Sequence, residues 1–294
     1  VGYLKDPVPT LFIQDEMHLI KESLGTFDAH YESFLYYYAK RMVKPDHRKK
    51  IRFIGATATI SMYQEHIRNL YHMEPKRFPC EYPSVKNGED FYSYTDENDI
   101  TRIILGYAPY GRSITDGMWE SVYFMRRVVY HMMDHLEESY ETLKQQGFTA
   151  SIEEYQNMLF DYWIELVYNN RKQDAIELEN AFQNQANNRL AAKNIPLYVI
   201  KQMTSDVDFQ TVRKTLFDIQ TNKKNTDSTN LILATSTISH GVDEDSFNIM
   251  YFFGMPNNNA EYIQAYSRTG RKYTGIVIDI IRLMRVRDRS YLKN

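Results

Sequence analysis

The sequence of 294 residues contains one cysteine, Cys80, and therefore cannot form an internal disulfide bond. It lacks a charged-then-apolar leader, and it has no apolar run long enough to span a bilayer. It also lacks an excess of positive charge, since 35 Lys and Arg residues face 38 Asp and Glu residues, for a net charge of −3. We therefore expect a cytoplasmic protein without membrane contact, in which any binding of nucleic acid depends on a local cleft.

The composition that is present is typical of a folded, globular protein. Hydrophobic residues make up 43% of the chain and charged residues 25%, which excludes a disordered or fibrous protein. At roughly 150 residues per domain, the length predicts about two domains, each with a core of its own.

Short apolar runs alternate with helical periodicity along the chain. In the first part, residues 10–14 and 51–55 predict buried strands, and residues 22–40 and 61–71 predict the helices that follow them. Later strands are predicted at 163–168, 197–201, 230–234, 248–253 and 275–281, with helices at 173–184, 209–220 and 260–268. This alternation predicts an α/β fold in which helices flank parallel sheets.

Proline and glycine interrupt the pattern between residues 73 and 115, which is typical of a connection between domains. We therefore expect a first domain over residues 1–85, a connecting region over 86–150 and a second domain over 151–294. Within the connecting region, residues 102–108 predict a strand.

The strongest periodicity of the sequence also lies in the connecting region. Apolar residues recur at steps of three or four from Met118 to Leu143. This spacing predicts one long amphipathic helix that begins at Thr115 or Asp116 and ends at Gly147.

Polar residues stand directly after several predicted strands. After the first strand, Asp15 can hold the hydration shell of Mg²⁺, and Glu16 can accept a proton from water that attacks a phosphate. Thr57 and Thr59 follow the second strand. Because parallel sheets bind ligands beyond the carboxyl ends of their strands, we expect such residues to line that edge. Taken singly, an acidic pair or a group of hydroxyls can equally cap a helix.

A third block combines two later segments, which we also expect at a carboxyl edge. Gly241 would let the backbone approach a ligand closely, and Asp243 can accept hydrogen bonds from a ribose. Arg268 and Arg271 stand three apart at the end of a predicted helix, and their planar guanidinium groups suit phosphate oxygens. As an isolated feature, they would be a pair of surface arginines.

Taken in order, these blocks resemble the core of superfamily 2 helicases of the Asp-Glu-x-His type. Residues 15–18, Asp-Glu-Met-His, look like motif II, and residues 57–59 look like motif III. Residues 234–243 resemble motif V. Residues 264–271 resemble motif VI, Gln-x-x-Gly-Arg-x-Gly-Arg, with Ser267 in place of its first glycine.

More narrowly, residues 18–26 with Tyr31 and Glu32 are similar to DrmA-like helicases of DISARM phage-defence systems. The resemblance implies RecA-like parallel sheets flanked by helices, with a partial first helicase domain and a near-complete second one. It implies ATP and Mg²⁺ as cofactors and nucleic acid as partner, DNA rather than RNA, with defence-system proteins as further partners. The implied function is that of an ATP-dependent helicase or translocase.

The resemblance also implies roles for residues that match the motifs. Catalytic roles are implied for Glu16, Gln264, Arg268 and Arg271. Binding of nucleotide, or of Mg²⁺ through water, is implied for Asp15, Gly241 and Asp243. Coupling of the nucleotide site to nucleic-acid movement is implied for His18, Thr57 and Thr59. Contacts with the nucleic-acid backbone are implied for Thr204, Ser205 and Thr235.

The phosphate-binding Walker A sequence, Gly-x-x-x-x-Gly-Lys-Ser/Thr, does not occur in the chain, although in this family it precedes motif II. We therefore expect a fragment of a longer protein, with weak or no ATP hydrolysis by this chain alone. Two alternatives remain open: a nucleic-acid-binding or scaffolding module that has lost hydrolysis, and an RNA helicase. The retained Glu16 and the two arginines of motif VI favour a motor over a module.

Overall fold

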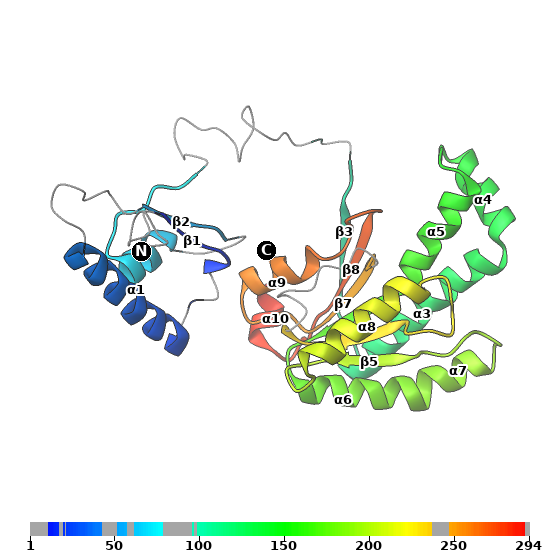
Figure 1. Ribbon diagram of the computed structural model, residues 1–294. Coiled ribbons are helices and arrows are strands. Elements are labelled where there is room, and N and C mark those ends of the chain that lie inside the picture. Colours follow the sequence, from blue (N-terminus) through cyan, green and yellow to red (C-terminus); the bar gives the residue numbers. More distant parts are fainter. Residues whose placement is uncertain are drawn as a thin grey trace. The chain divides into compact units, whose positions relative to one another are not determined.

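The computed structural model describes residues 11–17, 20, 22–42, 52–57, 62–78, 96, 99–236 and 247–291 (Figure 1). Its contacts divide the chain into two compact units, Val1–Glu97 and Asn98–Asn294. The first unit has a two-stranded sheet and the second a six-stranded sheet. Among the described residues, no helix is both long enough and apolar enough to cross a membrane.

The described residues of the first unit form two strands and two helices in the predicted order. Strand β1 (Leu11–Gln14) pairs in parallel with β2 (Arg52–Gly55). Helix α1 (Glu22–Met42) provides the crossover between them, and α2 (Tyr63–Tyr71) follows β2. The buried side chains of its small core are Met17, Ile20 and Leu70.

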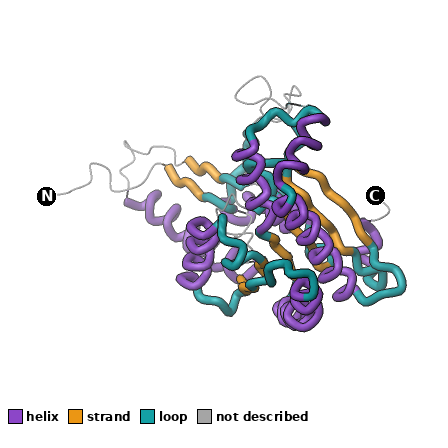
Figure 2. The backbone as a smooth tube through the Cα atoms, turned by 90° about the vertical axis from the view of Figure 1, so that its right-hand side faces the viewer, coloured by secondary structure: helices purple, strands orange, loops and turns teal. Residues whose placement is uncertain are grey.

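The second unit is a parallel sheet between helices (Figure 2). Its strands, in the order in which they lie side by side, are β3 (Arg102–Tyr107), β8 (Gly275–Ile280), β7 (Ile249–Phe253), β4 (Glu165–Asn169), β6 (Leu231–Ala234) and β5 (Ile200–Met203). Its helices, in chain order, are α3 (Ile114–Asp134), α4 (Leu136–Gln145), α5 (Ile152–Trp163), α6 (Lys172–Ala181), α7 (Asn187–Ala191), α8 (Phe209–Asn222), α9 (Asn259–Tyr266) and α10 (Val286–Tyr291). A π-helical turn, Phe182–Ala186, joins α6 to α7. The predicted α/β fold with parallel sheets is confirmed.

Two apolar cores, one on each face, hold the large sheet between its helices. On one face, α3, α6 and α7 pack against β4, β6, β7 and β8. On the other face, α8 and α9 pack against the same strands. Strands β4, β6 and β7 are therefore buried on both sides, which explains why they form nearly continuous apolar runs in the sequence.

Strand β3 is an outer strand of this sheet rather than part of a connection. It pairs with β8 along its whole length, from Arg102 opposite Gly275 to Tyr107 opposite Ile280. Most of the region 86–150, which we expected to connect two domains, thus lies in the second unit, from Asn98 onward. Local periodicity could not reveal this pairing, because the partner strand comes much later in the chain. Most side chains of β3 are exposed, and no described strand pairs with its outer side.

The single long helix that we expected up to Gly147 is two helices, separated at His135 (φ −113°, ψ 49°). The hydroxyl of Ser113 accepts a hydrogen bond from the backbone N–H of Asp116, so α3 begins earlier than expected. At the break, the hydroxyl of Ser139 lies 3.0 Å from two backbone carbonyl oxygens and offsets the local loss of helical bonding. The apolar stripe continues through the break, and periodicity therefore does not detect it.

Candidate functional site

The acidic block lies where β1 and β2 end together. The last residues of the two strands are opposite each other in the register of the parallel pair. The backbone N–H of Ala56 donates to the carbonyl oxygen of Gln14 at 2.9 Å, and the N–H of Met17 donates to that of Ala56 at 3.1 Å. The intervening residues, Asp15 and Glu16, are exposed. The structure therefore presents two carboxylates to solvent at the carboxyl edge of this pair.

Two local features fix the acidic turn. Glu16 adopts φ 52°, a conformation that is uncommon for a residue with a side chain, and its N–H donates to Oδ1 of Asp15 at 2.8 Å. Met17 is buried against Gly55, where a Cβ would lie 1.8 Å from its sulfur. The absence of a side chain at residue 55 thus allows the turn to pack against β2.

Some predicted site residues fall outside the described part of the chain. Thr57 is described; it is half-buried and follows directly after the junction of the two strands, at the same edge as the acidic pair. The predicted residues His18, Thr59, Gly241 and Asp243 lie outside the described residues.

In the second unit, the structure brings two predicted threonines together at the carboxyl edge of the sheet. Met203 and Ala234 are opposite each other as the last residues of β5 and β6, so Thr204 and Thr235 follow at neighbouring strand ends. The N–H of Thr235 donates to the carbonyl oxygen of Met203 at 3.1 Å. Both threonines are buried, whereas Ser205 is exposed.

Two asparagines at the end of the central strand β4 escaped the sequence analysis. Asn169 is fully buried; its Nδ2 donates to the carbonyl oxygen of Ala234 at 3.3 Å, and its Oδ1 has no hydrogen-bond partner among the described residues. Nδ2 of Asn170 lies 3.1 Å from the carbonyl oxygens of Gly254 and Met255. The signal that could have revealed them is a pair of amides directly after an apolar run.

Three arginines gather at the same edge. Arg171 follows β4 by two residues, and Arg282 follows β8 by two residues. Burial lowers the pKa of Arg285, and the positive charges of Arg282 and Arg171 lower it further, whereas Asp288 and Asp174 raise it. Nη2 of Arg282 donates to Oδ2 of Asp174 at 2.9 Å. An edge that carries several guanidinium groups suits the phosphate oxygens of a nucleic-acid backbone.

The segment 264–271 lies at the opposite edge of this sheet. Helix α9 leaves the end of β7 and returns to the beginning of β8, as a crossover between parallel strands must. Nε of Arg102, the first residue of β3, donates to the carbonyl oxygen of Thr269 at 2.5 Å, which places the segment beside the amino ends of β3 and β8. The expectation that this segment lines a carboxyl edge was therefore wrong. Exposure rises along its three predicted site residues, from buried Gln264 through half-buried Arg268 to exposed Arg271.

A buried carboxylate connects α9 to the sheet. The hydroxyl of Tyr262 on α9 donates to Oδ2 of Asp279 on β8 at 2.6 Å. Burial raises the pKa of Asp279 to about 6, and the hydrogen bond from Tyr262 opposes this increase. This contact lies two residues before Gln264 and anchors the helix that leads to the arginines.

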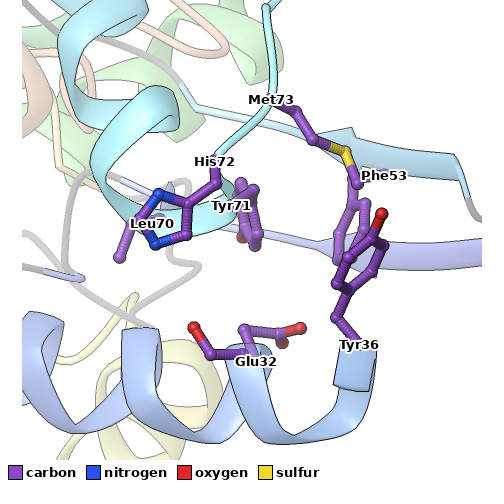
Figure 3. A pocket seen from close by; sticks show the side chains of 8 residues that line it. Glu32, Tyr36, Phe53, Leu70, Tyr71, His72 and Met73 are labelled. Carbon is purple, nitrogen blue, oxygen red and sulfur yellow. The ribbon is translucent and has the colours of Figure 1, made fainter. Parts of the chain in front are cut away.

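The first unit contains a cavity of about 190 Å³ (Figure 3). Glu32 and Tyr36 of α1, Phe53 of β2, and Tyr71 and Met73 at the end of α2 contribute to its lining. Burial, together with the nearby charges of Glu32 and Asp28, raises the pKa of Tyr71 to about 12. None of the predicted site residues that the structure describes is among those that line this cavity.

The sequence from 160 to 273 matches a family model described as the helicase conserved C-terminal domain. Residues 160–273 are therefore similar to the C-terminal domain of helicases. The matched range begins within α5, includes strands β4 to β7 with α9, and ends just beyond Arg271.

The chain as a whole is also similar to known proteins. The chain is 27% identical to the DISARM protein DrmA of Bacillus paralicheniformis, over 97% of this chain and 25% of that protein. The structure of the DUF1998 helicase MrfA bound to DNA is similar with a TM-score of 0.59 and 14% identity, over 97% of this chain and 31% of MrfA. The structure of the Mycobacterium smegmatis helicase Lhr bound to ssDNA and AMP-PNP is similar with a TM-score of 0.50 and 15% identity, over 92% of this chain and 28% of Lhr.

These comparisons confirm the resemblance to superfamily 2 helicases of the DrmA type. They also confirm the RecA-like fold of parallel sheets flanked by helices. The chain spans a quarter of the length of DrmA and less than a third of MrfA and Lhr.

Proposed function

We propose that this chain is the part of an ATP-dependent helicase or translocase that carries the acidic end of the first RecA-like domain and the second RecA-like domain. The observation that carries the proposal is the helicase match over residues 160–273, because that range includes α9 and the two arginines that follow it. DNA is the proposed substrate, since MrfA and Lhr are both described as bound to DNA. The similarity to DrmA supports a cytoplasmic role in phage defence, together with other proteins of such a system.

The acidic edge of the first unit acts on the nucleotide in this proposal. Asp15 and Glu16 are exposed carboxylates, and oxygen donors of this kind fit Mg²⁺ that keeps several of its waters. Asp15 holds the ion through water. The ion, when bound, neutralises charge on the phosphates. Glu16 accepts a proton from the water that attacks the γ-phosphate.

The segment 264–271 completes the nucleotide site from the second domain. Gln264, Arg268 and Arg271 reach the triphosphate, where the guanidinium groups stabilise the charge of the transition state. Gly241 and Asp243 contact the nucleotide from the same domain.

The carboxyl edge of the second sheet contacts the nucleic-acid backbone. Predicted contacts come from Thr204, Ser205 and Thr235, and Arg285 is a further donor at the same edge. The arginines of segment 264–271 lie at the other end of the strands, so the sheet separates nucleotide contacts from nucleic-acid contacts.

Coupling between these sites is the proposed role of three residues of the first unit. His18, Thr57 and Thr59 relay the state of the nucleotide to the nucleic acid, and hydrolysis then changes the relation of the two domains and moves the strand stepwise.

The test is ATP hydrolysis by the uninterrupted gene product, with and without single-stranded DNA or RNA. We expect stimulation by DNA, and loss of hydrolysis in the Glu16→Gln variant, because an amide cannot accept the proton. Stronger stimulation by RNA would identify an RNA helicase. Absence of turnover with either polymer, combined with nucleic-acid binding that ATP does not change, would identify a binding module and refute the proposal.

A further inference from the structure

The turn that carries Arg268 and Arg271 is held by a residue from the other end of the unit. Arg102 donates from Nε to the carbonyl oxygen of Thr269 at 2.5 Å and from Nη2 to that of Ser267 at 3.2 Å. Its guanidinium carbon also lies 5.8 Å from the centre of the ring of Tyr266. One side chain therefore binds two carbonyl groups on either side of Arg268.

These two carbonyl groups belong to residues that directly follow helix α9. Helix α9 ends at Tyr266, and the following residues form tight turns in which the N–H of Thr269 donates to the carbonyl oxygen of Tyr266 at 2.9 Å. A cation at this end also complements the negative end of the helix dipole. Arg102 thus binds the turn after α9 with a planar group that donates from two nitrogens, a geometry that lysine cannot imitate.

The backbone beyond this turn is packed without free space. Gly270 adopts φ 75°, and a Cβ there would lie 2.4 Å from the carbonyl oxygen of Thr101 and 2.8 Å from the nitrogen of Gly275. The N–H of Gly275 donates to Thr101 at 2.9 Å. Thr269 is fully buried. The arginine-bearing turn is therefore fixed against the first residues of β3 and β8.

We propose that Arg102 is a positioning residue for Arg268 and Arg271: its guanidinium holds the backbone on both sides of Arg268 and sets the direction in which the two arginines leave the fold. The proposal rests on the proposed function of these arginines at the triphosphate. Arg102 does not touch the nucleotide in this arrangement and acts only through the turn. Strand β3 would then serve the reaction although it lies outside the range of the helicase C-terminal match.

The test compares Arg102→Ala and Arg102→Lys in the uninterrupted gene product, by steady-state ATP hydrolysis with saturating DNA. Displacement of a catalytic group by about 1 Å can reduce the rate by a factor on the order of 100, so we expect a fall of about that size in kcat for Arg102→Ala, with KM for ATP little changed. Arg102→Lys retains the charge and one of the two contacts, and we expect a smaller fall. Arg189→Ala is the control, because Arg189 belongs to the same unit but stacks on Trp119, in the core of the opposite face from α9.

A background that lacks both arginines separates positioning from simple loss of structure. If Arg102 acts through the turn, Arg102→Ala should reduce kcat no further once Arg268→Ala and Arg271→Ala are both present. The same fold-loss in both backgrounds, or an unchanged kcat in Arg102→Ala, would overturn the proposal. If Arg102→Ala does not fold, the same cycle is measured with Arg102→Lys.

Hydrogen exchange keeps this test independent of the proposed function. In the Arg102 variants, the amides of residues 267–271 should exchange faster, whereas those of the buried strand β4 should not change. Unchanged exchange at 267–271 would refute the role of Arg102. A gene product without ATPase activity would refute the proposed function, and exchange would still decide whether Arg102 holds the turn.

Discussion

Removal of Arg126 should destabilise the second unit strongly, because it would leave a buried carboxylate without its cation. Nη2 of Arg126 lies 2.8 Å from Oε2 of Glu165, and both side chains are at most 1% exposed. Arg126 also donates to the carbonyl oxygen of Asn230 at 2.9 Å, and its guanidinium lies 3.9 Å from the ring centre of Trp163. Breaking a buried pair of this kind costs about 3–5 kcal/mol, and we expect a loss of that size for Arg126→Met, which retains most of the packing volume.

Unfolding in urea, followed by tryptophan fluorescence, measures this loss, since Trp163 lies directly against the guanidinium. The matched control is the double variant Arg126→Met/Glu165→Leu, in which no charge is left unpaired; it should recover most of the stability. A loss below about 1 kcal/mol in the single variant, or a double variant no more stable than the single one, would refute the reasoning.

The loss of stability in Arg126→Met should also depend on pH, and it should grow as the pH rises. Burial raises the pKa of Glu165 to about 7, from 4.5 in its ordinary state, while Arg126 and Tyr251 lower it. Without Arg126 the pKa in the folded state rises further, so the folded protein takes up a proton as the pH falls. The destabilisation by Arg126→Met should therefore be larger at pH 8 than at pH 5. Equal losses at both pH values would contradict this assignment.

Three further substitutions test other parts of the structure. Asp279→Asn should stabilise the protein more at pH 7 than at pH 4, relative to the wild type. The carboxyl of Asp279 has a folded pKa of about 6 against an ordinary value of 3.8, so its ionisation destabilises the wild type as the pH rises. The gain in unfolding free energy, measured in urea, should be about 2 kcal/mol larger at pH 7 than at pH 4. Gly270→Ala should cost about 2 kcal/mol or more, from its positive φ and the contact with the backbone of Thr101, and a thermal melt that matches the wild type would contradict this. Arg285→Ala should weaken nucleic-acid binding equally for all sequences and reduce the slope of log affinity against log salt by about 1; an unchanged slope would remove Arg285 from the interface.

The sequence predicts the sheet well and the placement of the site only in part. Residues 230–234 and 248–253 are apolar throughout because β6 and β7 are buried on both faces, and such runs are visible without a structure. Segment 264–271 could be recognised by its motif but not placed correctly, since the path of α9 depends on which strand it returns to. The contact of Arg102 with Thr269 joins residues far apart in the chain, and no local pattern contains it.

Strand β3 has a practical consequence for any work with the isolated chain. Ile103, Ile104 and Leu105 are 45–48% exposed on a six-residue strand whose outer side meets no other described strand. Unpaired apolar edges recruit strands from other molecules, so the purified chain should associate edge to edge as its concentration rises. A charge on the strand, as in Ile104→Lys, should oppose this association and yield the more tractable sample for solution measurements.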